Sequence, residues 1–175
     1  VRPGSSISRE ELKFALDSVY STGWFSGVRV EPINGPLGVQ LLVEVDPNPV
    51  FKQVQLLPDN VKIPSTILDK IFRPDYGKTL NLNVLQLRIN ELKQWYVDQG
   101  YSLARISGPN RVTANGMVQL KVGEGLVSGI EVRFLNKDGE LNNKEEEFIN
   151  GKTQIWFIKR EISMRSGDVF NRNQL

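Results

Sequence analysis

The side chains that most enzymes use for acid–base or nucleophilic chemistry are scarce in this sequence. Its 175 residues include no histidine and no cysteine. Zinc sites built on thiolates or imidazoles, cysteine nucleophiles and every catalytic triad that contains histidine are therefore excluded. An enzyme would need serine with lysine, or two converging carboxylates. No spacing nominates such a set, so an enzyme ranks last among the function classes, and we expect no metal and no cofactor.

Three segments could bind a ligand, and each has a simpler interpretation. Glu145-Glu146-Glu147 could hold a divalent cation, but consecutive positions do not converge on one ion, which favours a solvated acidic run. Residues 34–38 (Asn-Gly-Pro-Leu-Gly) resemble a phosphate cradle but lack the lysine and Ser/Thr of a P-loop, which favours a hairpin turn. The third segment interleaves cations with aromatic rings as nucleic-acid binders do, yet in a short helix that spacing gives one apolar and one charged face. Its residues are Lys152, Trp156, Phe157, Lys159, Arg160 and Arg165.

Composition describes a globular chain of weakly basic charge. Hydrophobic residues make up 39% and charged residues 24%, enough for both a core and a polar surface. Twenty-two Lys and Arg oppose 20 Asp and Glu, and the net charge of +2 is scattered along the chain, which argues against nucleic acid as the partner. Five aromatic residues could grip a peptide, but sealing the ends of small cores is the favoured interpretation. They are Trp24, Phe25, Trp95, Tyr96 and Tyr101.

The elements that would position any site are repeated. Three segments share a glycine, an apolar residue three positions later, then Ser or Asn, then a leucine four further on. Ser8, Asn81 and Asn171 are the predicted helix N-caps, and Glu11 completes a capping box with Ser8. The first two caps lead into apolar helical stripes that end at Gly23 and Gly100. The three segments begin at Gly4, Gly77 and Gly167.

The segments between the helices alternate in hydrophobicity and predict strands and hairpins. A short helix is predicted over 65–72, between Pro64 and Arg73-Pro74, and another over 153–164. The predicted strands are 28–31, 39–45, 51–57, 103–106, 117–122 and 127–135. The order strand, helix, helix, strand, strand is complete only over 50–125. Residues 1–49 and 126–175 are incomplete units, so we expect the chain to be part of a longer protein, with 136–152 as an insertion.

Three short motifs in this order resemble the polypeptide-transport-associated (POTRA) domains of BamA-type outer-membrane assembly factors and their cyanobacterial and chloroplast relatives. They are residues 21–30 (Ser-Thr-Gly-Trp-Phe-Ser-Gly-Val-Arg-Val), 43–49 (Val-Glu-Val-Asp-Pro-Asn-Pro) and 95–101 (Trp-Tyr-Val-Asp-Gln-Gly-Tyr). The resemblance implies an α+β fold of tandem βααββ units, each a three-stranded mixed sheet covered on one face by two helices. The middle unit departs from the family at Gly123-Glu124-Gly125, which has no proline.

The resemblance also implies a non-catalytic module that binds polypeptides by strand addition to an exposed sheet edge. The edge residues would be Val28, Arg29, Val30, Leu103, Ala104, Arg105 and Ile106. The implied partners are unfolded outer-membrane proteins or transported preproteins, neighbouring units, a downstream membrane β-barrel and accessory assembly proteins, but no nucleic acid. The implied location is the periplasm or the intermembrane-space face of the chloroplast outer envelope. The alternative is a basic α+β nucleic-acid-binding module.

The joints between units are predicted to differ in stiffness. Pro47 and Pro49 each fix one backbone angle in the first joint, whereas Gly123 and Gly125 leave the second joint with more accessible conformations. We therefore expect the first joint to be the stiffer one.

Overall fold

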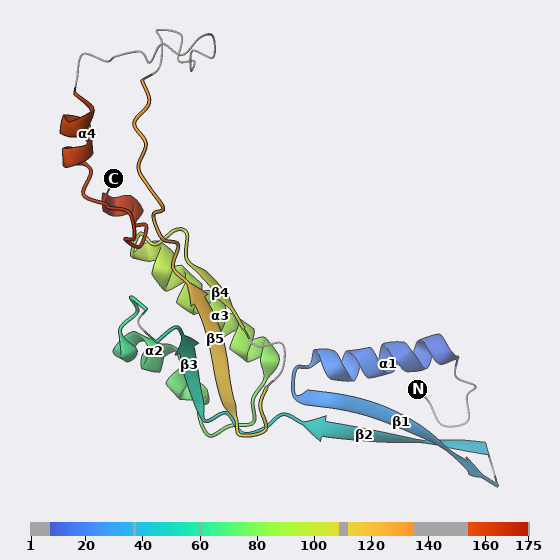
Figure 1. Ribbon diagram of the computed structural model, residues 1–175. Coiled ribbons are helices and arrows are strands. Elements are labelled where there is room, and N and C mark those ends of the chain that lie inside the picture. The colour runs from blue at the N-terminus through green and yellow to red at the C-terminus, as the bar shows by residue number, and fades with distance from the viewer. Residues whose placement is uncertain (1–7, 37, 60, 109–111, 135–153, 175) are drawn as a thin grey trace, which may run out of the picture. The chain divides into compact units, whose positions relative to one another are not determined.

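The computed structural model describes residues 8–36, 38–59, 61–108, 112–134 and 154–174 (Figure 1). Contacts between residues group the chain into two compact units, Val1–Gln94 with Ile106–Val122, and Trp95–Arg105 with Gly123–Leu175. Within the described ranges, no helix is long and apolar enough to cross a membrane. The predicted insertion at 136–152 lies outside the described residues.

The chain begins with a helix and a hairpin. Helix α1 (Arg9–Ser21) starts at the predicted capping box: the Glu11 amide donates to the Ser8 hydroxyl, and the Ser8 amide donates to the Glu11 carboxylate at 2.9 Å. That hydrogen bond lowers the pKa of Glu11, because the ionised carboxylate is the better acceptor. Strands β1 (Phe25–Gly35) and β2 (Gly38–Pro47) follow as an antiparallel pair joined at the predicted turn.

The second sheet has three strands in the order β3-β5-β4, which are β3 (Gln53–Leu57), β4 (Arg105–Ser107) and β5 (Met117–Gly123). Strands β3 and β5 run parallel, with Gln53 opposite Met117. A parallel pair needs a long crossover, and α2 (Ser65–Phe72), the 3₁₀ turn η1 (Arg73–Asp75) and α3 (Leu82–Asp98) supply it (Figure 1). Helix α2 has the bounds predicted from the sequence, and the α+β fold class is confirmed.

The apolar core lies between this sheet and its helices. The largest side chains that are almost fully buried are Tyr96, Phe51, Phe72, Leu92, Leu120 and Val118. Phe51 contacts the rings of Phe72 and Tyr76 edge to face, with centroids 6.4 and 5.0 Å apart. The alternation of buried and exposed residues along β5 places the apolar side chains of this strand toward the core.

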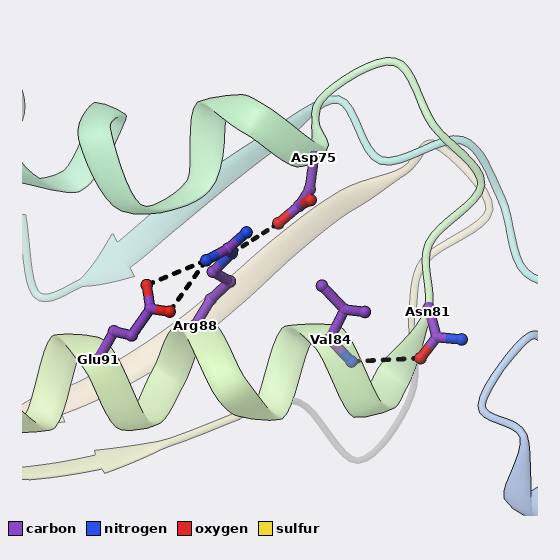
Figure 2. A network of polar contacts seen from close by, with 5 residues as sticks. All are labelled: Asp75, Asn81, Val84, Arg88 and Glu91. Carbon is purple, nitrogen blue, oxygen red and sulfur yellow. Dashed lines mark hydrogen bonds and ion pairs between the residues drawn. The ribbon is translucent and has the colours of Figure 1, made fainter.

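Polar contacts fix the start of α3 (Figure 2). The Asn81 side-chain oxygen accepts the backbone amides of Asn83 and Val84, so the predicted N-cap is confirmed. One turn further along, Arg88 donates to Asp75 at 2.7 Å and to Glu91 at 2.9 Å. The hydrogen bond to Asp75 is the main cause that raises the pKa of Arg88. The Arg88–Asp75 bond therefore ties η1 to the side of α3.

The C-terminal part contains short elements. Helix α4 (Ile155–Glu161) lies inside the predicted range 153–164, and a 3₁₀ turn η2 (Arg172–Gln174) follows. The Asn171 side-chain oxygen accepts the Asn173 amide, as expected for the third cap.

The strand predicted over 127–135 was wrong for its described residues, the one predicted over 103–106 begins too early, and the one predicted over 28–31 is too short, because β1 is longer. Described residues 127–134 form no strand, and the residue before them, Leu126, makes an isolated bridge to Val169. Alternating hydrophobicity predicts a strand, but a strand also needs a neighbour to bond to, as β3 has in β5. Leu103 and Ala104 lie in a turn before β4, because the Ala104 amide donates back to the Tyr101 carbonyl at 3.1 Å.

Candidate functional site

The predicted polypeptide-binding edge of the middle unit is β4, the terminal strand of the three-stranded sheet. Of the four residues predicted there, Arg105 and Ile106 lie in the strand, whereas Leu103 and Ala104 precede it. Ile106 is 6% exposed and anchors the strand in the core, while Arg105 and Ser107 on either side of it are exposed. An incoming chain would thus meet a short strand held from behind by one buried side chain.

The opposite edge of the same sheet is less available. The Val54 backbone amide of β3 donates to the Tyr76 hydroxyl at 3.3 Å, so a side chain already occupies a hydrogen-bonding position at this strand. Burial raises the pKa of Tyr76 above its ordinary value, which keeps the phenol neutral. Of the two edges, β4 is therefore the better candidate for strand addition.

The second predicted edge is β1, in the N-terminal hairpin. Val28, Arg29 and Val30 pair with Val45, Glu44 and Val43 of β2. Arg29 contacts Glu44 at 3.7 Å and Asp46 at 3.2 Å across the strands, and its side chain is 65% exposed. Exposed ion pairs of this kind add little stability. The Arg29 side chain can therefore leave these ion pairs at little cost and contact another chain beside β1.

The first joint is held by a residue that sequence reasoning missed, Asn48, which lies between the predicted hinge prolines. Asn48 is 5% exposed, and its side-chain amide donates to the carbonyls of Gly23 at 2.8 Å and Leu80 at 2.9 Å. Its backbone amide donates to the Trp24 carbonyl at 2.9 Å. Pro49 contributes its carbonyl, which accepts the Leu80 amide at 3.0 Å. The joint is thus fastened by buried hydrogen bonds in addition to the two proline rings.

The cap asparagine of α3 also bonds to the C-terminal end of α1. The Asn81 side-chain amide donates to the Thr22 carbonyl at 2.9 Å, and the Leu82 backbone amide donates to the Gly23 carbonyl at the same distance. Gly23 has φ +78°, and a Cβ there would lie 2.9 Å from the Asn81 side-chain oxygen. Only glycine accommodates both the backbone angle and the close approach.

This arrangement recurs at the end of α3. The Asn171 side-chain amide donates to the Gln99 carbonyl at 3.0 Å, and the Arg172 amide donates to the Gly100 carbonyl at 2.9 Å. Gly100 has φ +90°. We call each such set, an asparagine cap bonded to the glycine-terminated end of an earlier helix, an asparagine clasp. Its signal in the sequence is the repeated Asn-x-Asn at 81–83 and 171–173, which sequence reasoning interpreted only as caps.

The predicted hinge glycines of the second joint have different surroundings. Gly123 ends β5, and nothing lies within 4 Å of the position that a Cβ would take. Gly125 has φ +77°, and a Cβ there would lie 2.6 Å from the Leu103 Cβ. Its carbonyl accepts the Phe170 amide at 2.8 Å. Gly125 is therefore held in place by packing and hydrogen bonding, while Gly123 stands in open space.

The described residues contain a small cavity beside the first joint and a wider hollow beside α2 that is open to solvent. Within these ranges, no group of three or more acidic residues could hold a metal ion. A cavity of about 60 Å³ beside the first joint is lined by Trp24, Phe51, Leu80, Val84 and other residues. A cofactor pocket is several times larger. Among the five aromatic residues singled out earlier, Tyr96 is buried, whereas Trp24, which lines this cavity, is 45% exposed.

Comparisons with known proteins agree with this architecture. The sequence model of the POTRA domain, ShlB type, matches residues 50–125. The solved structure of POTRA1-3 of the periplasmic domain of Omp85 from Anabaena is 43% identical, and the match covers 99% of this chain and 69% of that chain with a TM-score of 0.85. The N-terminal domain of Omp85 from Thermosynechococcus elongatus is 35% identical, with 99% and 71% covered and a TM-score of 0.79.

Curated relatives are more distant and much longer. Outer envelope protein 80 of Arabidopsis thaliana chloroplasts is 27% identical over 99% of this chain, which spans 22% of that protein. Protein TOC75-3 of Arabidopsis chloroplasts is 26% identical over 71% of this chain and 13% of its own length. The chain thus spans less than a quarter of either of these relatives.

Proposed function

The chain belongs to the POTRA domains of Omp85-type proteins, and from this membership we propose that it is a non-catalytic polypeptide-handling module of an outer-membrane assembly or translocation factor. The proposed location is the periplasmic side of an outer membrane, or the corresponding side of a chloroplast outer envelope. Support comes from the similarity to a periplasmic Omp85 domain and to chloroplast outer envelope proteins. The proposed domain order is an incomplete unit over 1–49, a complete unit over 50–125 and an incomplete unit over 126–175.

The proposed mechanism is strand addition at β4, and the observation that carries it is the terminal place of β4 in the sheet. An edge strand presents backbone amides and carbonyls that an extended chain can pair with, whatever its sequence. Ile106 keeps the strand in place from the core side, and the exposed Arg105 and Ser107 flank the binding position. Clients would include unfolded outer-membrane proteins or transported preproteins. Val28–Val30 of β1 is the second proposed edge.

The mechanism predicts that main-chain hydrogen bonds of the client carry the affinity. The test uses a peptide of alternating sequence taken from an outer-membrane strand and two versions of it, each N-methylated at every second residue, in opposite registers. A methyl group on an amide removes that donor and crowds the edge, so one register should abolish binding and the other should not. Binding is followed by backbone amide shifts of Arg105 and Ser107, with Val54 of the opposite edge as the internal control.

Two outcomes would reject the mechanism. One is equal binding by both methylated peptides, because side-chain contacts would then carry the affinity. The other is a larger shift at Val54 than at β4, which would place the peptide on the edge that Tyr76 already occupies.

A further inference from the structure

Helix α4 corresponds to α2 in the repeat. Helix α2 starts at Ser65 and precedes Gly77 by the same number of residues as α4, starting at Ile155, precedes Gly167. Both glycines have positive φ, +81° and +93°. The flanking hydrogen bonds also match: the Gly77 amide donates to the Phe51 carbonyl at 2.8 Å, and the Gly167 amide donates to the Val127 carbonyl at 2.8 Å.

The correspondence shows which face of α4 points outward in a unit that has all its elements. In α2, the positions Thr66, Asp69 and Lys70 are exposed, although both helices and all three strands of that unit are present. Ile67 and Leu68 are half-buried, and Phe72 is buried. The equivalents of the three exposed positions are Trp156, Lys159 and Arg160, and we call these three residues the outer face of α4.

The chemistry of the outer face of α4 differs from that of its counterpart. Where α2 has a threonine, an acid and a lysine, α4 has a tryptophan and two cations. The Trp156 side chain is 61% exposed, and the Arg160 guanidinium lies 5.6 Å from its ring centroid and 4.8 Å from that of Phe157. The helix is coloured red in Figure 1. A large amphipathic ring among cations is typical of a surface that meets lipid headgroups, where the ring enters the interface and the cations stay hydrated.

Nearby acidic residues neutralise only part of the positive charge on the outer face of α4. Glu161 contacts Arg160 at 3.2 Å and offsets part of its charge. The charge of Lys159 lowers the pKa of Glu131, but the main cause of that shift is the hydrogen bond from Arg133, which holds the Glu131 carboxylate with two bonds of 2.6 and 2.7 Å. Arg133 therefore neutralises Glu131 and leaves the Lys159 charge available.

We propose that the outer face of α4 binds the surface of a membrane that contains anionic lipid. The inference rests on the proposed function, which places the chain beside an outer membrane. Each Lys or Arg near an anionic surface strengthens membrane partition by roughly fivefold, and the Trp156 ring adds a contribution that does not depend on charge. The contact would orient the module relative to the membrane while β4 handles its client.

The test measures binding of the 175-residue chain to phosphatidylcholine vesicles with and without about 30% phosphatidylglycerol, an anionic lipid. We expect binding to the anionic vesicles with a blue shift in tryptophan emission, which Trp156→Phe should abolish. The double variant Lys159→Gln/Arg160→Gln should lose roughly 25-fold in partition, and Glu161→Gln should gain severalfold. The matched control Lys70→Gln, on the equivalent face of α2, should change partition less than twofold.

Three results would overturn the proposal. They are no binding to anionic vesicles, an effect of Lys70→Gln as large as that of the double variant, or tighter binding of the same face to single-stranded DNA than to lipid. The vesicle test and the strand-addition test, both run on the unmodified chain, separate the two proposals. No vesicle binding with register-dependent peptide binding overturns only the membrane contact, whereas vesicle binding without register-dependent peptide binding overturns only the function proposed for β4.

Discussion

Replacing Asn48 by alanine should loosen the first joint more than any exposed substitution near it. The Asn48 side-chain amide is the donor of two hydrogen bonds, to the carbonyls of Gly23 and Leu80, and the residue is 5% exposed. Water cannot easily replace a donor at so buried a position, so both bonds are lost without compensation. Asn83→Ala is the matched comparison, because the Asn83 amide donates to the Ser21 carbonyl at the same joint, but at an exposed position.

The hydrogen bonds of Asn48 set the loss of stability that we expect at the first joint in Asn48→Ala. A typical intramolecular hydrogen bond contributes about 0.5–1.5 kcal/mol, so two buried bonds correspond to about 1–3 kcal/mol of joint stability. The Gly23 carbonyl still accepts the Leu82 amide in the variant. The bond from Asn48 to Gly23 should therefore contribute near the lower end of the range for one hydrogen bond. For Asn83→Ala we expect at most about 0.5 kcal/mol, because water replaces an exposed partner.

Native-state hydrogen exchange measures this opening directly. The reporter is the Leu82 amide, which bridges the joint through its bond to the Gly23 carbonyl at 2.9 Å. A loss of 1–3 kcal/mol corresponds to roughly 5- to 150-fold faster exchange in Asn48→Ala. Exchange within twofold of the unmodified chain, or an equal acceleration in Asn83→Ala, would refute the claim that burial of Asn48 sets the stiffness of the joint.

Three further substitutions test other parts of the fold. Gly125→Ala should destabilise by about 1–2 kcal/mol or more through its positive φ and the approach to Leu103, whereas Gly123→Ala should be near neutral in the same urea titration. Arg88→Met should lower the free energy of unfolding by about 1 kcal/mol, because the partly buried Asp75 loses its partner; an unchanged urea midpoint would contradict this. Glu11 contributes stability above its unfolded pKa, near 4.5, that is lost as pH falls through its lowered folded pKa. Glu11→Gln should therefore remove a corresponding part of the acid dependence of unfolding, measured between pH 3 and 7.

Local signals predicted the helices well, because their information lies within a few residues. The Ser8–Glu11 capping box and the Asn81 cap have the predicted partners, and α2 has the predicted bounds. Strand prediction was weaker at the ends of the units. Residues 127–135 alternate as a strand should, yet 127–134 form none, because a ladder depends on a neighbouring strand that alternation cannot supply.

The sequence by itself determined the repeat, the family and the absence of histidine and cysteine chemistry, because residue types and their spacing express these directly. Only the tertiary structure decided that Asn48, Asn81 and Asn171 bond to the ends of helices far from them in the chain. The same holds for Tyr76, which occupies one sheet edge while β4 lies at the other. Asn81 and Thr22 are far apart in the chain and 2.9 Å apart, donor to acceptor, in space. Hydrogen bonds between residues that are distant in the chain depend on how helices and strands pack against each other, and local sequence patterns do not specify that packing.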